Sequence, residues 1–121
     1  LHTNLTPQTH HMIGPNQFER MKRTAVLVNT SRGPIVDNMA LYEALKTGKI
    51  AYAALDVTDP EPLPANHPLL TLENVIVAPH IASASVATRT KMGLMAADNL
   101  IAGLKGEMPP NPVNPEVLKK R

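Results

Sequence analysis

One histidine stands at the end of a short apolar segment, where its side chain could transfer a proton. His80 follows residues 75–78, Val-Ile-Val-Ala, and Pro79. Imidazole changes charge near neutral pH, so a histidine in this place suits general acid or base chemistry. A single histidine after a strand is more often a hydrogen-bonded structural residue. The assignment of chemistry to His80 therefore depends on its companions.

The segments on either side of His80 are predicted to be a buried strand and a long helix. Consecutive apolar residues, most of them β-branched, are typical of a strand buried on both faces of a parallel sheet. Pro79 ends this strand because proline cannot donate a ladder hydrogen bond. Ser83 and Ser85 are candidate N-caps of a helix that runs up to Gly106. Ligands of open α/β sheets bind at the carboxyl ends of the strands, where His80 would lie.

Two earlier strand patterns enclose another helix. Residues 24–30 and 51–57 are predicted to be buried strands, and Asp37 is a candidate N-cap for a helix over 38–47 that Gly48 terminates. This order forms one βαβ unit, which requires parallel strands and a right-handed crossover. The remaining patterns predict a short helix over 16–21, an irregular proline-rich loop over 58–68, and a non-helical extended tail over 107–117.

The amino-acid composition excludes several classes of protein. The 121 residues include no cysteine, which excludes a disulfide framework and thiolate metal sites, and no apolar run is long enough to cross a bilayer. The formal net charge is only +2, and the chain has one Phe, two Tyr and no Trp, so no stacking platform for nucleic acid is indicated. We therefore expect a soluble, intracellular, cytoplasmic protein that binds neither nucleic acid nor membrane.

The positions of the glycines and histidines bear on two kinds of site, a dinucleotide-binding loop and a metal site. The six glycines form no G-x-G-x-x-G, so a dinucleotide-binding domain would keep its pyrophosphate-binding half upstream of Leu1. The chain would then be a piece of a longer protein and the second half of a doubly wound α/β sheet. Four histidines, at positions 2, 10, 11 and 67, lack the spacing to carboxylates that would suggest a metal site, so no metal is expected.

Three local signatures occur in a fixed order. They are Val-Asn-Thr-Ser-Arg-Gly at 28–33, Ala-Leu-Asp-Val at 54–57 with Glu-Pro at 61–62, and Pro-His-Ile at 79–81. Together they resemble the C-terminal part of the cofactor domain of D-isomer-specific 2-hydroxyacid dehydrogenases, and within that family the glyoxylate and hydroxypyruvate reductases. The resemblance covers nearly the whole chain. One departure is Ala82, which stands where many members of the family carry glycine.

The resemblance implies roles for three residues in the reduction of a 2-oxo acid. Arg32 would bind the substrate carboxylate, since a guanidinium stays charged and can pair with a carboxylate through two hydrogen bonds. His80 would donate the proton to the carbonyl oxygen. Glu61 would orient the imidazole and favour its protonated form, because it supplies an opposite charge.

The resemblance also implies a binding site for NAD or NADP. Asp56 would bind the nicotinamide carboxamide, although a strand-end capping role for Asp56 is the alternative. The full set of cofactor-binding residues that the resemblance implies is Pro7, Thr30, Ser31, Arg32, Asp56, His80 and Ser83.

At the level of the whole protein, the resemblance implies an NAD(P)-dependent oxidoreductase that reduces glyoxylate or hydroxypyruvate, and a homodimer. Residues 1–106 would be the C-terminal part of the dinucleotide-binding domain, and residues 107–121 would return to a substrate domain. The isolated chain is expected to be inactive because half of the cofactor contacts lie elsewhere. The alternative is a binding module of the same fold that senses a dinucleotide without catalysis.

Overall fold

A computed structural model describes residues 1–120, which form two compact units. The first unit is Leu1–Ala82, and the second begins at Ser83. The first contains α1 (Pro15–Glu19), β1 (Val26–Asn29), the 3-10 helix η1 (Gly33–Ile35), α2 (Asn38–Lys46), β2 (Tyr52–Leu55), the 3-10 helix η2 (Pro68–Thr71) and β3 (Val75–Val77). The second contains α3 (Val86–Leu104) and the 3-10 helix η3 (Pro115–Lys120).

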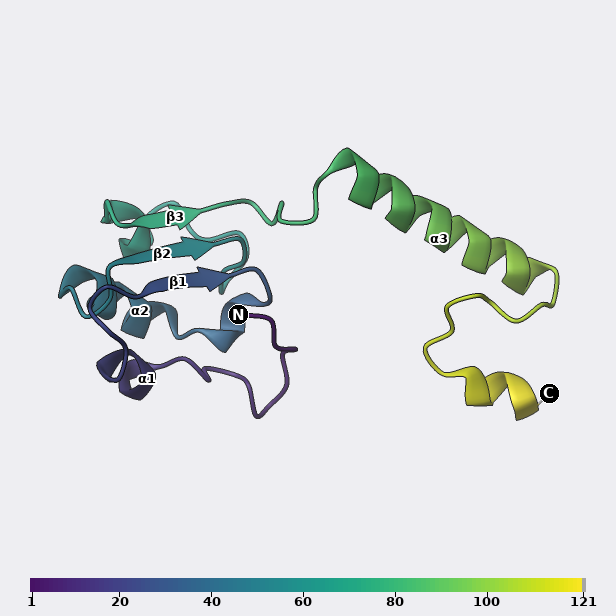
Figure 1. The fold of residues 1–121 in the computed structure, drawn as a ribbon, viewed down its shortest axis with the longest axis horizontal. Coiled ribbons are helices and arrows are strands. Elements are labelled where there is room, and N and C mark those ends of the chain that lie inside the picture. Colours follow the sequence, from purple (N-terminus) through teal and green to yellow (C-terminus); the bar gives the residue numbers. More distant parts are fainter. Residues whose placement is uncertain (121) are drawn as a thin grey trace. The chain divides into compact units, whose positions relative to one another are not determined.

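The three strands form one parallel sheet in the order β1-β2-β3 (Figure 1). Leu27 of β1 is opposite Ala53 of β2, which is opposite Val75 of β3. The predicted βαβ unit and the α/β fold class are thus confirmed. Because all strands run in one direction, their carboxyl ends meet at a single edge of the sheet.

Local capping chemistry defines α2. The carboxylate of Asp37 accepts hydrogen bonds from the amides of Met39 and Ala40, each at 3.0 Å, which satisfies two donors that the first helical turn leaves free. Gly48 follows the helix with φ of 67°, a left-handed conformation that glycine adopts without steric cost. Both residues act as the sequence predicts.

The core lies on one face of the sheet. Alternate strand residues point to this face, where Leu27, Ala53 and Leu55 are almost fully buried. The helices supply Phe18, Leu41, Ala44, Leu45 and Leu69 to the same cluster. Burial of each large apolar side chain contributes about 1.5–3 kcal/mol, so the packing of these helices on the sheet stabilises the first unit.

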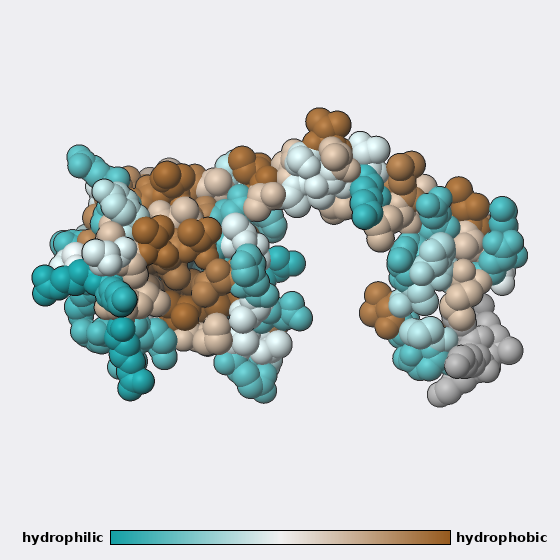
Figure 2. Space-filling view, viewed as in Figure 1, coloured by the Kyte–Doolittle hydropathy of each residue, from teal (hydrophilic) through white to brown (hydrophobic). Residues whose placement is uncertain are grey.

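No helix of the first unit, Leu1–Ala82, covers the opposite face of the sheet. Val26 is 59% exposed and Ile76 is 70% exposed, and apolar side chains gather over the strands (Figure 2). Within Leu1–Ala82 the strands are thus buried on one face, and burial of their other face stays a prediction. The apolar runs do make both faces apolar, but the helices of the first unit cover only one of them.

The second unit is built around α3. The Ser85 hydroxyl accepts a hydrogen bond from the Thr88 amide at 3.2 Å and caps the helix, and Gly106 follows its C-terminus with φ of 75°. The prediction that the tail contains no helical turn is wrong from Pro115 onward, since η3 begins there. Proline suits the first turn of a helix, where its missing amide costs nothing. Within residues 1–120, no helix is long and apolar enough to cross a membrane.

The close packing of Gly33 against the backbone of Thr58 can be tested by the addition of a single methyl group. A Cβ on Gly33 would lie 1.9 Å from the carbonyl oxygen of Thr58, whereas a Cβ on Gly14 would meet nothing closer than 3.6 Å. We predict that Gly33→Ala destabilises the intact protein by about 1–3 kcal/mol or more, because the backbone must shift. Gly14→Ala is the matched control and should cost less than about 1 kcal/mol. Urea unfolding measures both, and equal stability of the two variants would contradict the prediction.

Candidate active site

Polar residues follow each strand of the sheet at its carboxyl end. Thr30, Ser31 and Arg32 come directly after β1, Asp56 comes directly after β2, and His80 lies three residues beyond β3. The parallel topology therefore brings all five residues to one edge of the sheet, as ligand sites of open α/β sheets require.

A carboxylate engages the histidine. Nδ1 of His80 lies 2.7 Å from Oε1 of Glu61, a hydrogen bond between residues 19 positions apart in the chain. The other oxygen of Glu61 accepts a longer hydrogen bond, 3.4 Å, from the Thr58 amide. With Nδ1 engaged by Glu61, Nε2 is the ring nitrogen left for a reacting group. The pair has the chemical form of an oriented general acid.

The backbone of His80 has an unusual conformation that a second carboxylate supports. His80 has φ of 55°, in the left-handed region, which costs a residue with a Cβ roughly 1–2 kcal/mol. Asp56 is only 7% exposed, and its two oxygens accept hydrogen bonds from the amides of Ile81 at 2.7 Å and Ala82 at 2.9 Å. These bonds fix the two residues that follow His80. Asp56 thus acts as a cap across two strand ends, and its contact with a nicotinamide stays a prediction.

Both carboxylates are held in the ionised form. The hydrogen bond from His80 is the main cause that lowers the pKa of Glu61, and it outweighs partial desolvation. For Asp56, desolvation is the largest single influence and raises the pKa. The amides of Ala82 and Ile81 and the charge of His80 together outweigh desolvation, so the pKa of Asp56 lies below its usual value.

These residues line a cavity of about 480 Å³. Its polar lining residues are Asp56, Thr58, Glu61 and His80. The apolar lining consists of Pro62, Leu63, Leu70, Val77, Ala78 and Pro79. A small polar substrate or the flat ring of a cofactor would find both an apolar surface and a proton donor here.

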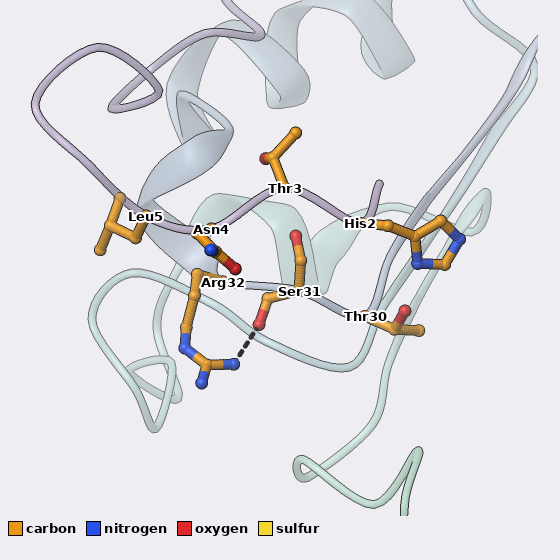
Figure 3. Close-up of a pocket in the computed structure, with 7 residues that line it drawn as sticks. All are labelled: His2, Thr3, Asn4, Leu5, Thr30, Ser31 and Arg32. Carbon is orange, nitrogen blue, oxygen red and sulfur yellow. Dashed lines mark hydrogen bonds between the residues drawn. The ribbon is translucent and has the colours of Figure 1, made fainter. Parts of the chain in front are cut away.

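Arg32 lines a different cavity, of about 450 Å³, between two segments of the chain (Figure 3). Its lining residues are His2, Thr3, Asn4, Leu5, Thr30, Ser31 and Arg32. The guanidinium donates a hydrogen bond from Nη1 to the carbonyl oxygen of Ser31 at 2.6 Å, which leaves its other donors for a ligand. The structure thus groups Glu61 with His80 and Arg32 with Ser31.

A buried asparagine holds the turn that carries Arg32. Asn29 is fully buried, and its side-chain amide donates to the carbonyl oxygen of Arg32 at 2.9 Å. Its side-chain oxygen accepts from the amide and the hydroxyl of Ser31, at 3.1 Å and 2.8 Å. Sequence reasoning missed this role, although a polar residue at the end of an apolar strand is a signal that could have found it.

The remaining predicted residues, Pro7 and Ser83, are not among the residues that line these two cavities. Ser83 is the first residue of the second unit. The segment 2–4, which no motif marked, contributes polar side chains beside Arg32 instead. In the described residues, the hydroxyl oxygen of Thr3 is buried without a hydrogen-bond partner.

The donor set fits part of a nicotinamide dinucleotide. Ribose hydroxyls and amides can be bound by the unpartnered Thr3 hydroxyl, the Thr30 hydroxyl and the Arg32 guanidinium. The Ser31 hydroxyl donates to Asn29, so it can only accept a hydrogen bond from a ligand. The pyrophosphate needs a glycine-rich turn at a helix N-terminus, and residues 1–120 contain none. The residues present therefore fit the nicotinamide end and not the pyrophosphate.

Residues 1–82 match the family described as D-isomer specific 2-hydroxyacid dehydrogenase, NAD binding domain. The chain belongs to this family. It is 62% identical, over all 121 residues, to a glyoxylate reductase of Korarchaeum cryptofilum, of which it covers 36%. The chain thus spans about a third of the length of the curated relatives that it matches.

Two solved structures of the family share the fold of the chain. A D-lactate dehydrogenase with NAD+ from Lactobacillus jensenii matches with a TM-score of 0.86 and 37% identity, over 93% of this chain and 38% of that one. An NADPH-dependent glyoxylate/hydroxypyruvate reductase from Sinorhizobium meliloti, in complex with NADP and malonate, matches with a TM-score of 0.82 and 38% identity. That match covers 91% of this chain and 34% of the other. The resemblance and the Rossmann-type fold class predicted from three signatures are confirmed.

The Glu61–His80 contact can be tested by titration. We predict that the pKa of Glu61, followed by NMR of its side-chain carboxyl carbon, lies below the ordinary 4.5 and rises in His80→Leu. Because the folded pKa is lowered, the pair stabilises the fold fully above pH 4.5, and this contribution is lost as pH falls through the lowered value. His67→Asn is the control, since asparagine can still cap η2, and should leave Glu61 unchanged. A Glu61 pKa that does not respond to His80→Leu would contradict the contact.

The capping role of Asp56 gives a separate prediction. Asp56→Asn keeps the shape of the side chain but replaces one acceptor oxygen by a donor that faces an amide. We expect the amides of Ile81 and Ala82 to exchange with solvent about tenfold faster or more, as hydrogen exchange with NMR detection would show. Asp98→Asn on α3 is the control for loss of charge. Unchanged exchange at Ile81 and Ala82 would remove Asp56 from this role.

Proposed function

We propose that the protein carrying this chain is an oxidoreductase that reduces a small 2-oxo acid, glyoxylate or hydroxypyruvate, to the D-2-hydroxy acid with NADH or NADPH. The observation that carries the proposal is the 2.7 Å hydrogen bond between Glu61 and His80 at the carboxyl edge of the parallel sheet. Family membership and the names of the relatives support the reaction class.

The residues of this chain would divide the work as follows. Arg32 binds the carboxylate of the 2-oxo acid through the donors that Ser31 leaves free. His80 donates a proton from Nε2 to the carbonyl oxygen, while Glu61 holds Nδ1 and stabilises the charge of the ring before transfer. Asp56 fixes the turn on which His80 stands.

Thr30, Ser31 and Arg32 would hold the nicotinamide end of the cofactor. Asp56 and His80 would lie near the nicotinamide ring, and Pro7 and Ser83 would contact other parts of the cofactor. When bound, the reduced cofactor supplies a hydride to the carbonyl carbon. The hydride and the proton from His80 together convert the carbonyl to a hydroxyl group, so atoms and charge balance.

We further propose that residues 1–106 complete a dinucleotide-binding domain whose phosphate-binding part precedes them in the intact protein. Residues 107–121 would return to the substrate domain, and the protein would be a homodimer. The chain alone lacks the groups that position the pyrophosphate, so we propose that it is inactive in isolation.

Kinetics of the intact protein test the function. With glyoxylate or hydroxypyruvate and NADH or NADPH, we predict that His80→Asn lowers kcat by about 10²–10⁴-fold, whereas Arg32→Gln mainly raises KM for the acid. Glu61→Gln should lower kcat and shift the pH profile of kcat/KM, since the imidazolium loses its partner. Turnover is followed by the loss of absorbance of the reduced nicotinamide.

Two matched controls accompany these variants. Arg20→Gln removes the exposed arginine that follows α1, and His67→Asn removes a histidine that lines neither cavity of the site. Both variants should keep full activity. Wild-type activity in His80→Asn would overturn the assignment of the proton donor. NADH binding without turnover of either acid would favour a module that senses a dinucleotide. Turnover by the isolated chain would refute its proposed inactivity.

A further inference from the structure

Two adjacent histidines and a distant aspartate meet on the surface of the first unit. One ligand-forming atom from each of His10, His11 and Asp59 lies within 4.8 Å of the other two, and all three residues are exposed. The rings of His10 and His11 stack with their centroids 4.0 Å apart. The chain spacing gives no hint of this group, because Asp59 is 48 positions from His11.

The backbone holds both loops in place. His11 has φ of 50°, a left-handed conformation that turns the chain so that neighbouring side chains can point the same way. Its amide donates to the carbonyl oxygen of Pro34 at 2.8 Å, and the amide of His10 donates to that of Thr6 at 3.0 Å. The side-chain amide of Asn38 donates to the carbonyl oxygen of Asp59 at 2.5 Å. Two main-chain hydrogen bonds and one from the Asn38 side chain thus set the positions from which the three side chains extend.

The three side chains have no other polar partner within residues 1–120. Neither imidazole ring and neither oxygen of the Asp59 carboxylate takes part in a hydrogen bond or ion pair there. His11 and Asp59 also line a common cavity of about 200 Å³, together with His67. The ligand-forming atoms are therefore free to close on an ion.

We propose that His10, His11 and Asp59 bind a divalent transition metal ion of the zinc class. Imidazole nitrogen and carboxylate oxygen are zinc ligands at about 2.0–2.2 Å, which places neighbouring ligand atoms about 3.3–3.6 Å apart in tetrahedral geometry. From 4.8 Å, a closure of at most about 1.5 Å is needed, which exposed side chains reach by small rotations. Three protein ligands leave the fourth position open. Mg²⁺ and Ca²⁺ prefer oxygen ligands and should bind this group poorly.

A bound ion would join two loops of the first unit. One is the turn that contains His10 and His11, and the other is the loop after β2, in which Asp59 precedes Glu61 by two positions. The ion would lie outside the two cavities of the candidate active site, whose lining includes none of the three ligands. The proposal is thus independent of the proposed reduction.

Calorimetric titration of the intact protein with ZnCl₂ alone, without nicotinamide cofactor, tests the site. We expect one ion per chain at this site, with an affinity that falls about tenfold or more in each of His10→Asn, His11→Asn and Asp59→Asn. Asparagine tolerates the left-handed backbone at His11, so that variant should fold, and circular dichroism checks each variant. A millimolar excess of MgCl₂ should not displace the Zn²⁺.

Control variants separate this site from other histidines. His2→Asn and Asp98→Asn should bind Zn²⁺ as the wild type does. His80→Asn matters most, because the Glu61–His80 pair could itself attract the ion. The proposal is overturned if Zn²⁺ binding disappears in His80→Asn but survives in His11→Asn and Asp59→Asn, if Mg²⁺ competes at equal concentration, or if folded wild type takes up no Zn²⁺. Retained binding in His80→Asn, together with loss in the three ligand variants, supports it.

Discussion

The hydrogen bonds from the Ile81 and Ala82 amides to the Asp56 carboxylate are the interaction on which the candidate active site depends. A nearly buried carboxylate costs free energy unless its oxygens are bonded, and a left-handed histidine costs free energy unless its neighbours are fixed. The same two hydrogen bonds offset both costs, because the amides that bind the Asp56 carboxylate belong to the residues that follow His80. Each feature thus supports the other.

The loop after β2 connects this arrangement to the turn that carries Arg32. Gly33 packs so closely on the backbone of Thr58 that a methyl group has no room, and the Thr58 amide donates to Glu61, which in turn binds His80. The loop after β2 therefore connects the turn that contains Arg32, after β1, to His80, after β3, through direct contacts. Catalysis by positioned groups requires such mutual support, since misplacement of about 1 Å can abolish the gain from orientation.

Features that depend on neighbours in the sequence were predictable. Asp37, Gly48 and Gly106 act as caps or terminators where the sequence places them, because capping uses residues within one helical turn. The three strands and their parallel order followed from apolar runs and connection lengths. The function class came from the order of three short signatures, and family membership agrees with it.

The Glu61–His80 contact was predicted only through the family resemblance, and other features that depend on three-dimensional proximity were not predicted in detail. The amides that bind Asp56 belong to residues 25 and 26 positions away in the chain. His11 lies near Asp59 because backbone bonds hold one loop and the Asn38 side chain holds the other. The sheet face that the helices of the first unit leave uncovered is another example. An apolar run indicates that a strand can be buried on both faces, but it does not indicate which residues cover each face. The same apolar strand can be covered by helices on one face of the sheet or on both. The number of covering layers is therefore set by the segments that pack on the sheet, and the sequence of the strand does not reveal it.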